Sequence, residues 1–274
     1  MAEILRPEEY RRVDETITEV IRKNLVWVNL LQPFRITEAD LEISWDEYSD
    51  MGAAKTDMFM EDMAFDNIAV GNRKTVLLPI THKEFLIRWR ELQAARRAGR
   101  DLDTANVAAA AAKVAEELDR NIALGNSAFG ISGIMNTSGI LTVTGADFGT
   151  APNAYETFRK ARDKLIENNI NPPFIAVLNP VQYGELDVLT ANDNNQRRMI
   201  EGNFVDRIYY SDLVPAGEGY VIAVSKQYMD RATLGGIKRK LWIDQDTENR
   251  KGRVWGIEIP RIRVATAICK MTGI

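Results

Sequence analysis

The sequence predicts an α+β protein, and three observations support this class. A long amphipathic helical pattern lies between residues 102 and 136, and a second one lies near the N-terminus. From 141 to 236, short apolar runs of strand length alternate with helical patterns. The C-terminal block, 237–274, reads as paired strands around a polar turn. Helices and strands are therefore mixed in one part of the chain and segregated in another.

The long helix is the most distinctive element. Asp103 or Thr104 can cap its N-terminus, and Gly125 follows its last apolar position, where a left-handed residue is usually needed. About 21 residues make a rod of about 30 Å, which suits a spine across a domain. Its apolar stripe recurs at three- and four-residue steps and consists of Val107, Ala111, Val114, Leu118 and Ile122.

A first helix is predicted from Pro7 to Leu25. Pro7 suits the first helical position, and acidic residues precede basic ones along the segment, as the helix dipole favours. Its narrow apolar face includes Tyr10, Val13, Ile17 and Ile21. We expect this face to dock on the protein's own core, and the same face could hold a partner peptide.

Residues 33–74 are acidic, rich in methionine and only weakly periodic. The alternation of Leu41, Ile43 and Trp45 predicts a strand, and Gly71-Asn72 predicts a turn. We expect an extended arm that contacts another subunit, because exposed apolar side chains of this kind usually mark a contact surface. The apolar residues concerned are Met58, Phe59, Met60, Met63 and Phe65.

Strands and shorter helices are predicted after the arm. Thr75–Trp89 reads as a strand that Pro79 interrupts or places at an edge. The later segments are strands at 140–145, 174–180, 203–210 and 220–225, helices at 152–169 and 180–189, and an exposed loop at 213–219. Near the C-terminus, 238–244 and 253–259 flank a hairpin turn, 261–271 adds a third strand, and Pro260 is expected to break the pairing between the last two.

Composition excludes several classes of protein. The formal net charge of −4 gives the whole chain no electrostatic reason to bind nucleic acid. The single cysteine, Cys269, rules out an intramolecular disulfide framework and fits a reducing compartment. No stretch approaches about 20 apolar residues, and the N-terminus lacks the apolar core of a signal peptide. We expect a soluble cytoplasmic protein without membrane contact.

The inventory of reactive groups is thin. The one histidine, His82, has no second imidazole to pair with, and Cys269 has no local signature of a nucleophile. Asp244 begins a calcium-like loop, but Asn249 and Trp255 stand where glycine and glutamate are needed. The acidic cluster of the arm reads as a solvated face. We therefore expect no catalytic residues, no metal, no cofactor and no enzyme activity.

The order of the parts resembles a known family. The segments RPEEYRRVDETITEVIRKNL, LLPITHKEFLIRWREL and DRNIALGNSAFGISGIMN follow one another, and a strand-rich tail closes the chain. This arrangement is similar to the encapsulins, the linocin-type shell proteins, and more widely to the major capsid proteins of the Hong Kong 97 phage fold. The resemblance covers nearly the whole chain.

The resemblance implies the Hong Kong 97 phage-type fold and a division into domains. It gives an N-terminal helix and arm (1–34), an extended loop (48–74), a peripheral domain that holds the spine helix (75–140 and 237–274), and an axial domain (141–236). It puts the loop after the predicted strand 203–210 at a symmetry axis, where it would line a pore. The pore residues would be Ser211, Asp212, Leu213, Val214, Pro215, Ala216, Gly217, Glu218 and Gly219.

The function that the resemblance implies is assembly of many copies into a hollow icosahedral shell. As an encapsulin-like nanocompartment, it would enclose a cargo protein held through a short peptide, on the interior face of Tyr10, Val13, Ile17 and Ile21. As the major capsid protein of a tailed virus or prophage, it would package a genome with portal and scaffold proteins. A small α/β enzyme with a site around Asn179, Tyr183 and Asp193 is the alternative from another class.

Overall fold

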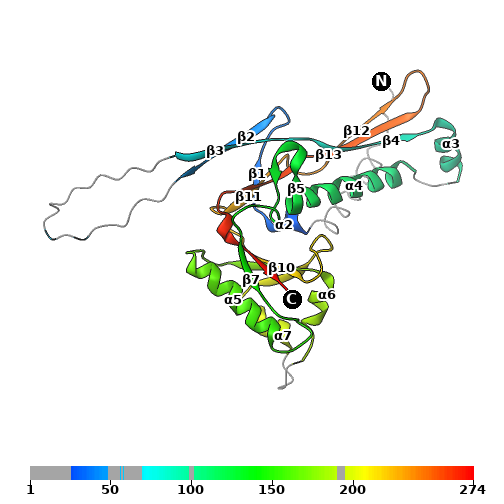
Figure 1. Cartoon of the computed structure of the whole chain (residues 1–274). Coiled ribbons are helices and arrows are strands. Elements are labelled where there is room, and N and C mark those ends of the chain that lie inside the picture. Colours follow the sequence, from blue (N-terminus) through cyan, green and yellow to red (C-terminus); the bar gives the residue numbers. More distant parts are fainter. Residues whose placement is uncertain (1–25, 49–55, 57, 59–69, 99–101, 190–194) are drawn as a thin grey trace.

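The computed structural model describes residues 26–48, 56, 58, 70–98, 102–189 and 195–274. Figure 1 shows an upper lobe built around helix α4, a lower lobe that carries helix α5, and a hairpin, β2–β3, that projects to one side. The predicted α+β class is confirmed. The first predicted helix, with Tyr10, Val13, Ile17 and Ile21, lies outside the described residues.

Helix α4 (Leu102–Leu124) is the spine of the upper lobe. All five residues of its predicted apolar stripe are buried, none more than 2% exposed. Gly125 follows the helix with φ +75°, so the predicted left-handed position is confirmed. Among the described helices, none is long and apolar enough to cross a membrane.

One face of a three-stranded antiparallel sheet packs on the spine. Its strand order is β12 (Lys238–Ile243), β13 (Arg250–Gly256) and β4 (Thr81–Ile87). Because side chains alternate along each strand, one face of the sheet points toward the helix. Leu241, Val254 and Phe85 lie on this face and share a core with the first turns of the helix. Helix α3 (Trp89–Arg97) connects β4 to the spine. The predicted C-terminal hairpin is confirmed, and β4 lies at the edge of the sheet.

The predicted arm begins as a two-stranded antiparallel hairpin. Strand β2 (Glu42–Tyr48) confirms the strand predicted around Ile43 and Trp45, and it pairs with β3 (Val70–Leu77). The turn predicted at Gly71-Asn72 is wrong, because both residues belong to β3. The register shifts beside Glu47, so Gly71 marks a β-bulge, which is a common place for glycine within a strand.

Pro79 interrupts the chain between β3 and β4, as predicted. A second proline prediction is wrong. Pro260 does not end a strand but lies within β14 (Glu258–Ile262), opposite Arg231 of β11 (Met229–Thr233). The sheet order is β1 (Pro33–Arg35), β11, β14, so the proline occupies an edge strand, where its missing N–H is tolerated.

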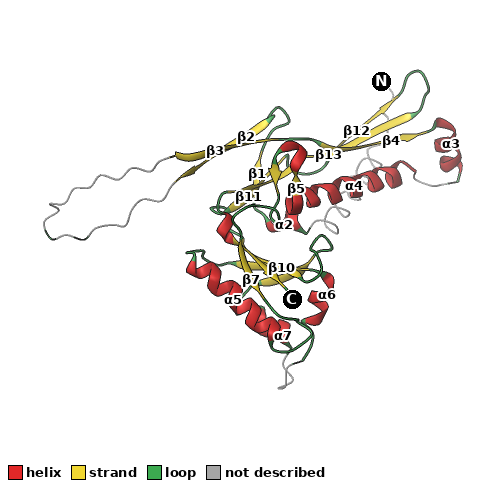
Figure 2. Cartoon of the chain, in the orientation of Figure 1, coloured by secondary structure: helices red, strands yellow, loops and turns green. Residues whose placement is uncertain are grey.

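A five-stranded mixed sheet forms the lower lobe, and α5, α6 and α7 flank it in Figure 2. Nearly every residue of its central strands, 174–178 and 218–223, is buried, as the apolar run at 174–178 predicts. The predicted helix at 152–169 is confirmed as α5, with Phe158, Ala161 and Leu165 buried. In sheet order the strands are β7 (Leu141–Thr144), β15 (Ile268–Thr272), β10 (Glu218–Ala223), β8 (Phe174–Leu178) and β9 (Arg207–Tyr210). The helices are α5 (Asn153–Glu167), α6 (Pro180–Glu185) and α7 (Gln196–Ile200).

The C-terminal strand crosses from one lobe to the other. The predicted single strand over 261–271 is wrong, because the chain leaves β14, passes through the short 3-10 helix Ala265–Ala267, and enters β15. Strand β15 pairs parallel with β7 and antiparallel with β10. We therefore propose that the domain division predicted above be revised, with residues 268–274 moved from the peripheral to the axial domain.

Glycines close the turn that follows the spine. Strands β5 (Gly125–Asn126) and β6 (Ile131–Ser132) pair around a 3-10 helix (Ser127–Phe129). A Cβ on Gly133 would lie 2.2 Å from the backbone nitrogen of Gly125, so only glycine fits this crossing. Of the apolar residues in this turn, Ile131 and Ile134 are buried, whereas Phe129 is 42% exposed.

Candidate functional site

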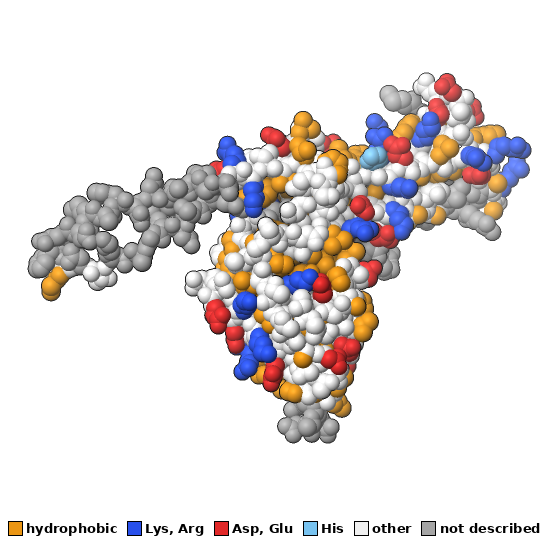
Figure 3. All heavy atoms as spheres, in the orientation of Figure 1, with side chains coloured by type: hydrophobic (Ala, Val, Ile, Leu, Met, Phe, Trp, Pro, Cys, Tyr) orange, Lys and Arg blue, Asp and Glu red, His pale blue; other side chains and the backbone are white. Residues whose placement is uncertain are grey.

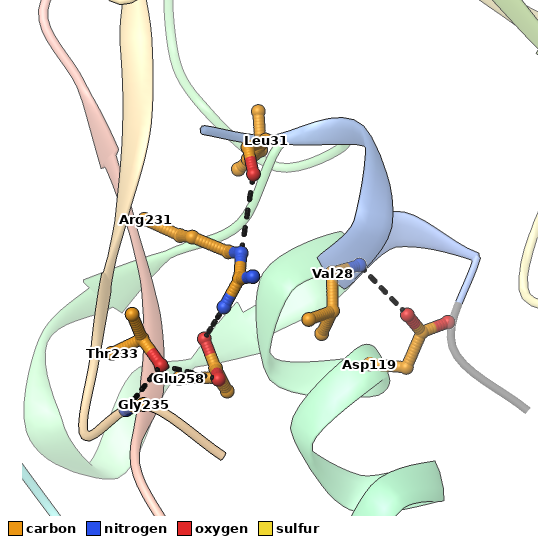
Figure 4. A network of polar contacts seen from close by, with 7 residues as sticks. All are labelled: Val28, Leu31, Asp119, Arg231, Thr233, Gly235 and Glu258. Atoms are coloured by element: carbon orange, nitrogen blue, oxygen red, sulfur yellow. Dashed lines mark hydrogen bonds and ion pairs between the residues drawn. The ribbon is translucent and has the colours of Figure 1, made fainter. Parts of the chain in front are cut away.

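The short helix α2 (Trp27–Leu30) lies where the two lobes meet. Asp119 of the spine accepts a hydrogen bond of 2.9 Å from the backbone N–H of Val28, as Figure 4 shows. On the side of the lower lobe, the Trp27 indole donates to Ser211 Oγ at 3.0 Å and meets the Tyr220 ring edge-on, with centroids 6.4 Å apart. Helix α2 therefore ties the spine to the lower sheet.

Asp119 is a buried carboxylate with a perturbed pKa. Burial raises its pKa, hydrogen bonds from the N–H groups of Val28, Trp27 and Val26 oppose the rise, and the charge of Asp212 adds a smaller rise, so that the pKa is about 6. These N–H groups belong to the first turn of α2 and the residue before it, which lack partners within the helix. Asp119 of α4 thus supplies the acceptor that these N–H groups of α2 lack within their own helix.

A second polar network joins α2 to the sheet β1–β11–β14. Arg231 Nε donates to the carbonyl of Leu31 at 3.1 Å, and the same guanidinium forms an ion pair with Glu258. Thr233 Oγ1 donates to Glu258 at 2.6 Å and accepts from the N–H of Gly235 (Figure 4). Burial raises the pKa of Glu258, and Arg231 and Thr233 oppose that rise.

A third buried charge lies on the same strands. Asp230 is fully buried and accepts two hydrogen bonds from Arg261, at 2.7 and 2.6 Å, and one from Arg263 at 3.0 Å. Arg261 in turn lies 4.2 Å from the centroid of the Phe34 ring. Such a paired and satisfied cluster fixes the geometry of its elements, and removing one partner would leave a buried charge without compensation.

The loop predicted to line a pore lies beside α2 and the C-terminus. Ser211 is buried. Val214 is also buried and Gly219 lies within β10, so the prediction of an exposed loop at 213–219 is wrong for these two residues. The Val214 carbonyl accepts a hydrogen bond from the Asn179 side chain at 2.7 Å. The Gly217 carbonyl accepts from the backbone N–H groups of Gly273 and Ile274. The exposed positions of the loop are Asp212, Pro215 and Ala216.

The arm residues are placed only in part. Met58 is 90% exposed, whereas Phe59, Met60, Met63 and Phe65 lie outside the described residues. The prediction that they contact another subunit stays a prediction.

Two residues of the alternative enzyme site, Asn179 and Tyr183, have structural roles instead. Asn179 caps α6 by accepting from the N–H of Val181, and Tyr183 packs against Tyr210 and Arg197. Asp193 lies outside the described residues. Burial raises the pKa of the Cys269 thiol to about 11, so it is a poor nucleophile at neutral pH. Over the described part of the chain, no group of three acidic, histidine or cysteine side chains is placed to hold a metal ion.

The open face of the sheet β12–β13–β4 carries a surface that the sequence analysis missed. Strand register places Lys238, Lys240 and Trp242 beside Lys251, Arg253 and Trp255, and these beside His82, Glu84 and Leu86. Among the described residues, those that line a groove of about 950 Å³ on this face are Ile80, His82, Lys240, Trp242, Arg253 and Trp255. The alternation of tryptophan with basic residues in both hairpin strands is the signal that could have revealed it. On the face drawn in Figure 3, the described acidic and basic side chains are interspersed over the upper lobe.

The architecture defines a class of protein. The fold is similar to that of a virus-like particle from Pyrococcus furiosus, with a TM-score of 0.71 and 15% identity over 96% of this chain and 98% of that one. The capsid of Myoviridae phage XM1 also gives a TM-score of 0.71, with 12% identity over 89% and 90% of the two chains. The molecule has the Hong Kong 97 phage-type capsid fold, as predicted.

Sequence comparison identifies the family within that class. Residues 3–235 match the Linocin_M18 family, "Encapsulating protein for peroxidase", and the chain belongs to this family. It is 28% identical over 274 residues to the type 1 encapsulin shell protein EncA of Myxococcus xanthus, covering 98% of this chain and 94% of that protein. It is 23% identical to a diheme-cytochrome-encapsulin shell fusion protein of Kuenenia stuttgartiensis, covering 97% of this chain and 73% of the relative. The predicted encapsulin resemblance is confirmed, and the chain is a shell protein.

Proposed function

We propose that this chain assembles in many copies into a hollow icosahedral shell that encloses a protein cargo in the cytoplasm, and that its own role is structural and not enzymatic. The family match and the names of its relatives support a cargo-holding shell. Asp119 and the Arg231–Glu258 pair also fit this role, because they hold α2 in place between the lobes.

The observation that carries the proposal is the shape of the subunit. A two-lobed body with a projecting hairpin, and with Met58 90% exposed, leaves apolar surface in water that a monomer would normally bury. Neighbouring copies in a closed assembly can cover such surface repeatedly.

Electron microscopy of the purified full-length chain tests the proposal. We expect uniform closed particles that elute far ahead of a monomer in size-exclusion chromatography. A stable monomer that yields no particles over a range of salt and protein concentrations would overturn it. Particles that co-purify with a protein and without nuclease-protected DNA indicate a compartment, whereas DNA-filled particles indicate the capsid of a virus or prophage.

We propose that cargo binds on the interior face of the N-terminal helix, through Tyr10, Val13, Ile17 and Ile21. Replacing Ile17 by Asp would remove apolar surface from the centre of that face. We expect shells of unchanged size that lose their co-purifying protein, measured by mass spectrometry of the particles. An unchanged cargo content would argue against this face, and Glu15→Gln on another face of the helix is the control.

We further propose that the exposed part of the loop after β9, at Asp212, Pro215 and Ala216, faces a pore. Asp212→Lys should change the rate at which a small anion enters intact shells, followed by quenching of a dye trapped inside. Equal entry rates in parent and variant shells would place the pore elsewhere.

A further inference from the structure

A pocket of about 410 Å³ lies at the base of the hairpin β2–β3, where the hairpin leaves the upper lobe (Figure 1). Its walls come from β2, β3, the turn that follows the spine, the loop before β7, and β14. These segments are distant in sequence but belong to one described subunit. The pocket is therefore formed by a single chain, and it is separate from the joint around α2.

The hairpin turns one face of its base toward the upper lobe. Cross-strand register pairs Ile43 with Val76 and Trp45 with Lys74. Side chains two positions apart along a strand share a face, so these four lie on the same side of the hairpin. Ile43 and Val76 pack against the buried cluster that contains Ile131. This packing holds Trp45 and Lys74 beside each other at the wall of the pocket.

The indole N–H of Trp45 is buried and has no hydrogen-bond partner among the described residues. By contrast, the indole N–H of Trp27 donates to Ser211. A buried donor without an acceptor loses its hydration without compensation, so such a group in a folded chain needs an explanation. An indole nitrogen can only donate, and the missing partner is therefore a hydrogen-bond acceptor. The pocket that Trp45 lines has room for one.

The rest of the lining adds positive charge and further donors. Lys74 lies opposite Trp45, and its neighbour Arg73 pairs with Asp46 at 3.0 Å. Two hydroxyl groups, those of Ser132 and Ser138, belong to the lining. Among the described residues that line the pocket, none is an aspartate or a glutamate. The chemistry of the lining thus suits an anion.

Buried apolar residues form another wall of the pocket. Ile131, Pro260 and Ile262 line it, and the side chains of Ile131 and Ile262 are buried in the upper lobe. Beside apolar groups the local dielectric constant is low, so a hydrogen bond between a donor and an anion is stronger there than in water.

We propose that this pocket binds a phosphate group, either as the free ion or as part of a small phosphorylated molecule. The Trp45 indole, the Lys74 ammonium group and the two serine hydroxyls supply donors from three separate segments. A phosphate accepts hydrogen bonds through several oxygens in different directions, and lysine binds it as a point charge. The site is an addition to the shell function and does not depend on it.

Equilibrium dialysis of the full-length protein against radiolabelled inorganic phosphate tests the site. We expect saturable binding to a single class of site. Trp45→Phe keeps an aromatic ring but removes the N–H, and it should weaken binding about fivefold. Lys74→Met should weaken binding about tenfold, whereas Lys74→Arg should retain most of the affinity. The matched controls, Trp242→Phe and Lys240→Met on the sheet β12–β13–β4, should change the affinity less than about twofold.

Three results would overturn the site: binding that does not saturate, unchanged affinity in Trp45→Phe, or equal weakening by Lys74→Met and Lys240→Met. Each would mean that phosphate only associates with positive surface. Competition then distinguishes the two sources of phosphate. Displacement of the label by less glycerol phosphate than inorganic phosphate indicates a phosphorylated molecule, and otherwise the free ion is the ligand. Acetate that displaces the label as well as phosphate does would contradict a phosphate site.

Thermal unfolding gives a second measurement, because a ligand that binds only the folded chain raises its midpoint. Phosphate should raise the midpoint of the parent more than sodium chloride of equal ionic strength does. The rise should be smaller in Trp45→Phe, where only the general stabilising effect of phosphate salts remains. Equal rises in the two proteins would contradict the site. Particle formation is measured separately by electron microscopy, so a failure here leaves the shell proposal standing.

Discussion

The two large sheets of the subunit differ in how they are covered. The central strands of the lower sheet, β8 and β10, are buried almost throughout, and α5 packs on that sheet. The upper sheet, β12–β13–β4, is covered by the spine on one side and carries tryptophans and cations on the other. The lower lobe therefore has its core within one chain, whereas the upper sheet keeps a groove on one face over the described residues.

The joint between these regions combines apolar packing of α2, whose Trp27 and Val28 belong to a core shared with the lower lobe, with directional polar contacts. Asp119, Ser211, Arg231 and Glu258 hold α2 against both lobes through hydrogen bonds whose geometry is directional. A polar joint specifies the angle between the lobes more strictly than apolar packing does, because a displaced partner would leave a buried group unsatisfied.

The largest loss of stability is expected from a change in the core of the lower sheet. Phe158 of α5 is fully buried and packs on Phe148. Phe158→Ala should lower the free energy of unfolding by about 3–5 kcal/mol, because it opens a cavity in a core that cannot collapse around it. Urea denaturation at fixed protein concentration measures this, and a loss below about 1 kcal/mol would contradict the description of a tightly packed lower lobe.

The turn after the spine should be nearly as sensitive. In Gly133→Ala, the new Cβ would meet the Gly125 nitrogen at 2.2 Å and the Ala123 carbonyl oxygen at 2.5 Å. We expect a loss of about 3 kcal/mol, because backbone atoms cannot move aside cheaply. Gly130→Ala is the matched control: its Cβ meets nothing within 4 Å, and only the positive φ of 68° is strained, at about 1 kcal/mol. If both variants lost the same unfolding free energy, the clash at Gly133 would be relieved by backbone movement, and the prediction would be wrong.

Asp119 should make the joint pH-dependent. Its pKa is raised to about 6 in the folded chain, so the folded state keeps a proton that the unfolded chain releases between about pH 4 and 6. Stability from this group is therefore greatest below that window and falls as the pH rises through it, by up to about 3 kcal/mol.

Asp119→Asn should remove this slope, because the amide can accept a hydrogen bond without becoming charged. Its thermal midpoint should equal the parent's near pH 4 and exceed it at pH 7. Asp119→Ala instead leaves the Val28 N–H without its acceptor and should lose about 1–3 kcal/mol near pH 4. Its deficit relative to the parent should shrink as the pH rises, because alanine also removes the slope. Parallel pH profiles for Asn and parent would refute the assignment of the slope to this carboxyl.

The smallest effect on folding is expected on the open sheet. Leu86 is half exposed on the face opposite the spine. Leu86→Thr keeps strand propensity and should change the unfolding free energy of the subunit by less than about 0.5 kcal/mol. A loss comparable to that of Phe158→Ala would mean that this face belongs to the subunit's own core.

Local patterns were predicted well wherever one element's own periodicity decides the outcome. The spine stripe from Val107 to Ile122 and the alternation around Trp45 both appear as expected, since side-chain direction follows directly from helical and strand periods. Predictions of which strands pair with one another were less accurate. Pro260 was expected to lie between two strands but is within β14, and β15 pairs with strands of the lower sheet. Sequence patterns do not reveal this, because edge positions and strand order are properties of the whole sheet.

The sequence by itself determined the α+β class, the spine helix and the acidic arm, because each depends on residues close together in the chain. Only the tertiary structure decided that Asp119 caps α2 across 91 positions, that Ser211 is buried against Trp27, and that two tryptophans and Lys240 line one groove. The physical reason is that burial and pairing depend on which distant segments are brought into contact. That choice is made by the packing of the complete chain, after local propensities have fixed its elements.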